Sequence, residues 1–304
     1  MSTRVVFMGS PDFALPTLRA LATNYDVVGV VTQPDRPAGR GKQLTPPPVK
    51  TLAEDLGLPI IQPARLREPA AVAQLRALAP GLIVVAAFGQ ILRQEVLDLP
   101  PHGCINVHAS LLPRWRGASP IQAAILAGDA ETGVTIMRMD KGLDSGPILS
   151  QRAMPIDAKD TAATLSDKLS SLGANLLVDT LPGCLSGELK SASQPEKGVT
   201  SAPILKKFDG ELDPGLGAEE LARKVRAFNP WPGAFIIWKG QPLKIHRAHA
   251  VQGKKSAGEH FVYDGQPAIG TLDGVLVLDE VQTPGKKTMS GAEFLRGARD
   301  WKNS

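Results

Sequence analysis

The sequence predicts an α/β protein in which a mainly parallel sheet, with helices on both faces, is followed by a small C-terminal β-barrel. In the first two-thirds of the chain, short apolar segments alternate with stretches of helical period, which is typical of βαβ units. Beyond residue 206, one helical stretch precedes several short segments separated by turn residues. We therefore expect a Rossmann-like domain over residues 1–188, a polar linker over 189–206 and a barrel of OB type over 207–304.

The elements of the first part follow from the spacing of apolar residues. Arg4–Gly9 contains a short apolar run, which predicts a buried strand. A helix over 13–22 follows from apolar residues at helical spacing. Ser119 and Pro120 form the N-cap and first turn of another helix, which Gly128 ends. Further strands are expected at 26–32, 82–87, 103–108, 132–139 and 148–155, and further helices at 49–56, 69–78, 92–97 and from a cap at Asp160 to about 178.

Residues 33–49 interrupt this alternation. They contain five prolines and two glycines and show no apolar period. Their charges are mostly basic, with Arg36, Arg40 and Lys42 against Asp35. An irregular insertion of this length inside a compact domain is usually functional or disordered. From composition alone, a mobile solvated loop remains an alternative to a binding loop.

The last third predicts one helix over 218–227 and strands at 234–239, 242–250, 258–263, 268–271 and 274–281. Residues 206–304 hold 15 Lys and Arg against 12 Asp and Glu, which accounts for most of the net charge of +4. This surplus indicates a polyanionic partner only weakly, because an ordinary solvated surface would look similar. Six basic residues of this part are candidates for phosphate contacts: Lys206, Lys207, Arg223, Arg226, Lys286 and Lys287. Trp231 and Trp238 are candidates either for stacking on bases or for packing in the core.

Several classes of protein are disfavoured by what the sequence lacks. The first βα turn, Gly9-Ser10-Pro11, does not follow the G-x-G-x-x-G pattern, and no Walker A sequence occurs, so neither NAD nor ATP is expected. The two cysteines match no metal motif and are expected to be buried thiols. Neither a membrane-length apolar run nor a signal peptide is apparent. We therefore expect no metal, no membrane partner and a cytoplasmic location, and, for want of an evident assembly interface, a monomer.

Polar residues at the end of one predicted strand suggest a site. Ligands of an open parallel sheet bind outside the carboxyl ends of its strands. Asn106 and His108, two residues apart, should point to the same side there, and an amide donor beside an imidazole suits a developing oxyanion. Asp144 lies in a glycine-flanked loop between two strands. On the residues alone, structural hydrogen bonding by the first two and a simple turn role for Asp144 stay open.

The same residues carry a resemblance to a known family. The segment from Asn106 to Gly117, NVHASLLPRWRG, and the loop GLDSGP from Gly142 to Pro147 resemble the two signatures of the formyl-folate transferases. The basic insertion and the segment from Arg226 to Gly233 are similar to the branch of that family whose acceptor is methionyl-tRNA. The resemblance covers residues 4 to about 301, with no departure at any catalytic position.

The resemblance implies formyl transfer from 10-formyltetrahydrofolate, as co-substrate, to the α-amino group of methionyl-tRNA, with the initiator tRNA preferred. It implies that Asn106 and His108 stabilise an oxyanion, and that Asp144 holds His108 in its charged form and receives the amine's proton through water. Alternatives are a small-amine formyltransferase or formyl-folate hydrolase, and a non-enzymatic RNA-binding protein. The implied folate contacts are Phe88, Gly89, Ile91, Leu92, Ser110, Leu111, Leu112 and Pro113, and the implied tRNA contacts are Arg36, Arg40, Lys42, Lys206 and Lys207.

Overall fold

The computed structural model describes residues 3–38 and 43–303, which form two compact units. Unit 1 comprises residues 1–120, 131–155 and 166–202. Unit 2 comprises residues 121–130, 156–165 and 203–304. The chain thus enters unit 2 twice before its last third, and the predicted division at residues 188 and 206 stays a prediction.

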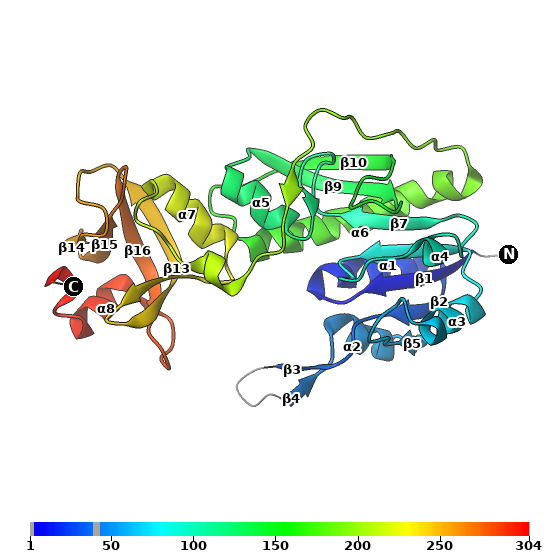
Figure 1. The fold of residues 1–304 in the computed structure, drawn as a ribbon, viewed down its shortest axis with the longest axis horizontal. Coiled ribbons are helices and arrows are strands. Elements are labelled where there is room, and N and C mark those ends of the chain that lie inside the picture. Colours follow the sequence, from blue (N-terminus) through cyan, green and yellow to red (C-terminus); the bar gives the residue numbers. More distant parts are fainter. Residues whose placement is uncertain (1–2, 39–42, 304) are drawn as a thin grey trace. The chain divides into compact units, whose positions relative to one another are not determined.

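A seven-stranded sheet forms the centre of unit 1 (Figure 1). Its order is β10-β9-β7-β6-β1-β2-β5, and the strands from β7 to β5 are all parallel. Within this sheet, β9 runs against its neighbours β7 and β10. This confirms the expected mainly parallel sheet. The strands are β1 (Arg4–Gly9), β2 (Asp26–Val31), β5 (Ile60–Ile61), β6 (Leu82–Ala86), β7 (Cys104–His108), β9 (Glu131–Arg138) and β10 (Ile148–Pro155).

Helices cover both faces of this sheet because its central strands are apolar on both sides. On one face, Val72 and Leu75 of α3 (Pro69–Ala77) and Val96 of α4 (Gln94–Leu97) join a buried cluster with Val6 and Ile83. On the other face, Gly173 of α6 (Ala162–Ser186) lies against Val107 and Val134. The other helices of the first two-thirds are η1 (Asp12–Ala14), α1 (Leu15–Asn24), α2 (Pro48–Asp55) and α5 (Pro120–Ala127).

Helix α6 differs from its prediction at both ends. The hydroxyl of Thr161, not the carboxylate of Asp160, accepts the hydrogen bond from the Thr164 backbone N–H at 3.3 Å, so the cap lies one residue later than expected. Asp160 instead accepts from the Thr164 hydroxyl and from the Asp157 N–H. The helix continues to Ser186, beyond the predicted end near 178, because Leu181 and Cys184 are buried.

The basic insertion is a hairpin rather than an irregular loop over its described residues. Strands β3 (Arg36–Ala38) and β4 (Gln43–Thr45) pair in antiparallel fashion. Asp35 anchors the base of the hairpin, because its carboxylate accepts from Lys50 at 2.7 Å and from Gln62 at 2.8 Å. Polar anchoring replaces the missing apolar period, which is why the spacing of apolar residues did not indicate these strands.

Unit 2 is built around an antiparallel sheet of order β12-β13-β16-β15-β14, with β17 paired to β16. Helix α7 (Ala218–Ala227), as predicted, packs Leu221 and Val225 into the core of this sheet, and α8 (Gly291–Gly297) adds Phe294. Neither β17 nor α8 was predicted. The strands are β12 (Ala234–Trp238), β13 (Gln241–Val251), β14 (His260–Tyr263), β15 (Gln266–Gly270), β16 (Val275–Gln282) and β17 (Met289–Ser290).

Candidate active site

Strand β7 presents Asn106 and His108 on one face of the sheet. Alternation along the strand turns Val107 toward α6 and leaves the two polar side chains on the opposite face. Both residues are nearly buried, with 9% and 5% of their surface exposed. Buried polar groups need hydrogen-bond partners, and both find them in loops outside the strand.

The loop between β9 and β10 brings Asp144 to these two residues. One carboxylate oxygen lies 3.7 Å from His108 Nδ1, and the other accepts a long hydrogen bond of 3.4 Å from the Asn106 side-chain amide. The first oxygen also accepts from the backbone N–H of Gly117 at 2.9 Å. The structure thus brings the three predicted catalytic side chains together from separate parts of the chain.

The loop after β7 fixes the tautomer of His108. Its Nε2 lies 3.0 Å from the carbonyl oxygen of Trp115. Because a carbonyl oxygen only accepts, Nε2 must carry a proton. In the neutral ring, Nδ1 therefore offers its lone pair on the side of Asp144.

Burial governs the charge of His108. Removal of the ring from water lowers the pKa of His108 below its usual 6.5, while the Asp144 carboxylate and the Trp115 carbonyl raise it without prevailing. Asp144 thus favours the charged form of His108, as the resemblance implies, but burial outweighs its influence on the pKa.

The predicted folate contacts lie in two segments that follow the parallel strands β6 and β7, at one edge of the sheet. In the first segment, Phe88 and Leu92 are 2% and 4% exposed and belong to the core. By contrast, Ile91 is 84% exposed and Gly89 is also accessible. The exposed pair is therefore the part of this segment that a ligand can reach, and all four contacts stay predictions.

The second predicted folate segment, Ser110 to Pro113, is anchored by its polar groups. The Ser110 hydroxyl donates to the carbonyl of Arg114 at 2.6 Å, and the Leu112 N–H donates to the Thr135 hydroxyl at 3.0 Å. Ser110 and Leu112 are buried, while Leu111 and Pro113 are partly exposed. Any ligand contact at this segment involves the partly exposed pair or the backbone.

Three of the five predicted tRNA contacts are exposed residues that the structure describes. Arg36 on β3 is exposed, as are Lys206 and Lys207 beside the short helix η2 (Lys207–Gly210). Arg40 and Lys42 lie outside the described residues. These five positions stay predictions.

Three further candidates from the last third have structural contacts. Arg223 donates to the carbonyl of Leu126 at 3.2 Å, and Arg226 donates to the carbonyl of Asp160 at 2.9 Å. Desolvation lowers the pKa of the half-buried Arg226. Trp238 packs against Phe294 and Trp301 in the aromatic core of unit 2. The two guanidinium groups are thus engaged with backbone oxygens, and Trp238 takes the packing role.

Several contacts at the site leave no recognisable pattern in the sequence. The carbonyl of Trp115 and the N–H of Gly117 are backbone groups, which carry no signature in a sequence. Gln194, in the expected linker, donates to the carbonyl oxygens of Asp144 and Gly146. Its neighbours along the chain are exposed and show no apolar period, so nothing in their pattern distinguishes it.

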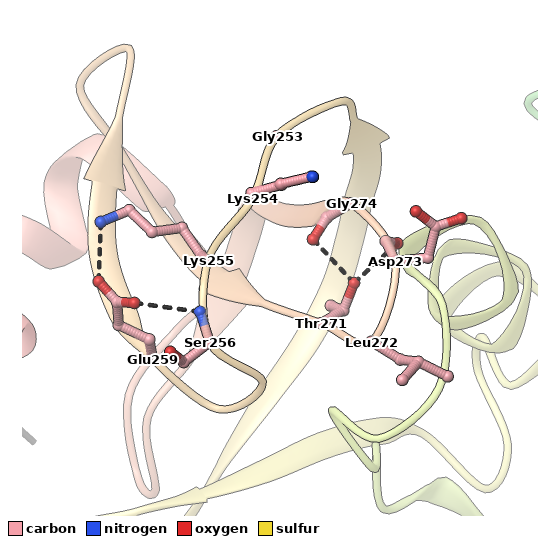
Figure 2. A pocket seen from close by; sticks show the side chains of 9 residues that line it. All are labelled: Gly253, Lys254, Lys255, Ser256, Glu259, Thr271, Leu272, Asp273 and Gly274. Carbon is pink, nitrogen blue, oxygen red and sulfur yellow. Dashed lines mark hydrogen bonds and ion pairs between the residues drawn. The ribbon is translucent and has the colours of Figure 1, made fainter.

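A hollow of about 620 Å³ lies elsewhere, in unit 2, between the loop after β13 and the turn before β16 (Figure 2). Its lining includes none of the predicted site residues that the structure describes. Lys255 is paired there with Glu259 at 2.8 Å, and the Thr271 hydroxyl donates to the carbonyls of Asp273 and Gly274. The polar groups at this hollow are thus largely engaged with one another, and we place no function in it.

Two structural features are absent from the described part of the chain. Within residues 3–38 and 43–303, no helix has the length and apolar character to cross a membrane. The same residues contain no group of three or more His, Cys, Asp or Glu side chains placed to hold a metal ion.

Comparisons with known proteins give a consistent result. Residues 3–181 match the family described as Formyl transferase, and residues 204–299 match the family described as Formyl transferase, C-terminal domain. The chain is 53% identical over 296 residues to a methionyl-tRNA formyltransferase of Magnetococcus marinus, covering 97% of this chain and 95% of that protein. It is 50% identical to a methionyl-tRNA formyltransferase of Myxococcus xanthus, with the same coverage of 97% and 95%.

A solved structure is similar to this fold. It is WlaRD, a sugar 3N-formyl transferase determined in the presence of dTDP and 5-N-formyl-THF, and it superposes with a TM-score of 0.69. The two sequences are 19% identical, and the match covers 94% of this chain and 100% of that one. At this identity the likeness supports the fold alone.

Proposed function

The chain belongs to the formyl transferase family, and from this premise we propose that it transfers the formyl group of 10-formyltetrahydrofolate to the α-amino group of methionyl-tRNA, the initiator species above all. The product is N-formylmethionyl-tRNA, used to begin translation. The similarity to methionyl-tRNA formyltransferases over 97% of the chain supports this acceptor. The observation that carries the chemistry is the convergence of Asn106, His108 and Asp144.

In this reaction Asn106 serves as a hydrogen-bond donor. Its amide has two N–H bonds, of which one is directed at Asp144. The side chain donates to the formyl oxygen as negative charge develops there during attack by the amine. One such donor is typically worth about 2.7–4 kcal/mol of the activation barrier.

His108 and Asp144 handle the proton. A free α-amine has a pKa of about 7.7–8.0, so part of it is neutral near pH 7 and ready to attack. As the new N–C bond forms, the nitrogen loses a proton, and the lone pair on His108 Nδ1 accepts it. Asp144, 3.7 Å away, then stabilises the imidazolium, which passes the proton to the departing folate nitrogen. The charged ring thus belongs to the reaction rather than to the resting site.

The substrates are proposed to bind at two kinds of surface. The exposed Ile91 and Gly89 and the partly exposed Leu111 and Pro113 offer apolar contact and backbone groups to the pterin ring. The basic residues Arg36, Arg40, Lys42, Lys206 and Lys207 are proposed to contact tRNA phosphates, the first three at the acceptor stem. We further propose a monomer that acts in the cytoplasm.

The function is tested by supplying 10-formyltetrahydrofolate with one acceptor at a time. We expect N-formylmethionine on methionyl-tRNA, detected by mass spectrometry after deacylation. A dTDP-linked amino sugar and glycinamide ribonucleotide serve as small-amine acceptors, and a reaction without acceptor reports hydrolysis. Formylation of a small amine only, or release of formate only, would contradict the proposal and favour the corresponding alternative.

A further inference from the structure

We propose that Gln194 is a positioning residue for formyl transfer, which holds the loop carrying Asp144 against the loop carrying Arg116 and Gly117. The inference rests on the proposed function, because it assigns a role in the same site. It concerns a segment whose polar composition predicted only a linker.

Residues 192–202, which we call the strap, run along unit 1 in contact with both site loops. Ala192 exchanges two backbone hydrogen bonds of 2.8 Å with Ile148, directly after the Asp144 loop. At the other end, β11 (Ser201–Ala202) pairs with β8 (Arg116–Gly117). Between them, the Thr200 hydroxyl accepts from the Trp115 N–H at 2.8 Å. The strap is therefore fixed to the segments that surround His108 and Asp144.

Gln194 uses the full hydrogen-bonding capacity of its amide. Nε2 donates to the carbonyl oxygens of Asp144 and Gly146, each at 2.8 Å. Oε1 accepts from Nε and Nη2 of Arg116 at 3.0 and 2.6 Å. The reversed amide would face donors with donors and acceptors with acceptors, so its orientation is determined. Among residues 191–199, Gln194 alone is partly buried, and the others are exposed.

The Asp144 backbone needs such support. Its φ of 49° lies in the left-handed region, which costs a non-glycine residue on the order of 1 kcal/mol and therefore persists only where the surroundings hold it. Gln194 holds the carbonyls of Asp144 and Gly146 on one side. On the other side it holds Arg116, whose neighbour Gly117 donates to the Asp144 carboxylate at 2.9 Å. The Gln194 amide thus holds both segments that form the hydrogen bond between the Gly117 N–H and the Asp144 carboxylate.

Close approach of the strap depends on Gly117. Its φ is 120°, and a Cβ added there would lie 2.6 Å from the Ala202 carbonyl oxygen. Only glycine allows the strap and the loop to meet at this point. The local sequence is therefore adapted to bring the strap against the site.

Two substitutions test the hydrogen bonds of the Gln194 side chain. Gln194→Met removes all four hydrogen bonds at similar size. Gln194→Glu keeps an acceptor for Arg116 but sets a carboxylate oxygen against the carbonyls of Asp144 and Gly146. Because misplacement of a reacting group by about 1 Å costs on the order of 10²-fold in rate, we expect both variants to lose kcat by about that factor. KM for both substrates should be unchanged. Gln74→Met, on the exposed face of α3, is the matched control and should behave as the native chain.

A second readout needs no substrate. Asp144 raises the pKa of His108, so loosening of its loop should lower the midpoint of the His108 ring titration followed by NMR. We expect this fall in Gln194→Met and none in Gln74→Met. A role for the strap in stability alone would lower Tm and leave the midpoint in place.

The outcomes are distinct. Native kcat in Gln194→Glu, or an unchanged His108 midpoint in Gln194→Met, overturns the positioning role. If Gln194→Met does not fold by circular dichroism, kcat of Gln194→Glu decides. If the native chain formylates no methionyl-tRNA, the proposed function fails, and the NMR midpoint still judges the placement of Asp144 by Gln194.

Discussion

At the scale of single residues, three groups lie next to the Asp144 carboxylate, and they differ in whether they can donate a hydrogen bond. Gly117 N–H and the Asn106 amide are donors, and the unprotonated Nδ1 of His108 becomes a donor only when the proton arrives. A carboxylate serves all three because both of its oxygens accept. A neutral amide of the same shape cannot stabilise the imidazolium.

We predict that Asp144→Asn folds normally and loses most of its activity, on the order of 10²-fold or more in kcat, as expected when a charge that stabilises the transition state is removed. The measurement is single-turnover formylation of methionyl-tRNA, with Tm as the check on folding. Asp140→Asn, in the same loop but bound to Gly142 and Ser145, is the control that should keep most activity. Near-native turnover in Asp144→Asn would remove the proposed role.

The buried His108 also predicts how stability depends on pH. Its pKa in the folded chain lies below the 6.5 of the unfolded chain. Above pH 6.5 His108 is unprotonated in both the folded and the unfolded chain, so its contribution to the free energy of unfolding is constant. As the pH falls below 6.5, the unfolded chain binds the proton first. The free energy of unfolding therefore decreases until the pH reaches the pKa of His108 in the folded chain. We expect urea denaturation between about pH 5 and 8 to show a smaller decrease in His108→Gln than in the native chain. Parallel curves would contradict a lowered pKa of His108.

Sequence patterns were informative for these residues only in part. Strand alternation placed Asn106 and His108 on one side, which the structure confirms. The prediction that Asp144 belongs to this site depended on the family resemblance, because its partners are 27 to 38 residues away along the chain. The resting charge of His108 depends on burial by the whole loop after β7, which no local pattern reports.

At the scale of elements, the β3–β4 hairpin carries the exposed Arg36 next to Asp35, whose carboxylate anchors the hairpin. We predict that Arg36→Ala raises KM for methionyl-tRNA several-fold without changing KM for the folate, because a side chain that contacts phosphate contributes salt-dependent affinity. The salt dependence of KM should weaken by roughly 0.7 to 0.9 in log–log slope. Arg67→Ala, an exposed arginine outside the hairpin, is the control. Equal effects of both substitutions would indicate a general surface charge instead.

Helix α8 begins with a capping box, for which the spacing of Ser290 and Glu293 in the sequence is typical. Ser290 accepts from the Glu293 N–H at 3.2 Å, and Glu293 accepts from the Ser290 N–H at 2.9 Å, which is a capping box. We predict that Ser290→Ala lowers the free energy of unfolding of unit 2 by about 1 kcal/mol. Urea denaturation followed by tryptophan fluorescence, to which Trp301 beside Phe294 of this helix contributes, measures it. Ser193→Ala, an exposed serine of the strap, should leave that value unchanged.

Other elements were missed or displaced for physical reasons. The hairpin lacks an apolar period because Asp35, Lys50 and Gln62 anchor it through polar contacts. The strap resembles a linker in sequence because many of its contacts are made by backbone atoms, and its side-chain contacts come from the isolated residues Gln194 and Thr200. Long apolar segments such as β1 and β6 were predicted within a residue, since burial on both faces leaves little ambiguity.

At the scale of the whole molecule, the change from alternating strands and helices to short strands predicted the two kinds of fold correctly. It could not show that residues 121–130 and 156–165 belong to unit 2. Both segments are interposed between stretches of unit 1 along the chain. Membership in a unit is decided by tertiary contacts, which become visible only in the fold.

The bonds that attach these two segments to α7 have a consequence for exchange of parts between relatives. Arg223 and Arg226 hold the backbone oxygens of Leu126 and Asp160, and Ala163 donates its N–H to the backbone oxygen of Asn229. Main-chain atoms are the same whatever side chain they bear. A hybrid that takes its last hundred or so residues from a homologue should therefore keep the contact at position 126 as long as the incoming helix supplies the guanidinium group of position 223, whatever side chain the recipient bears at 126.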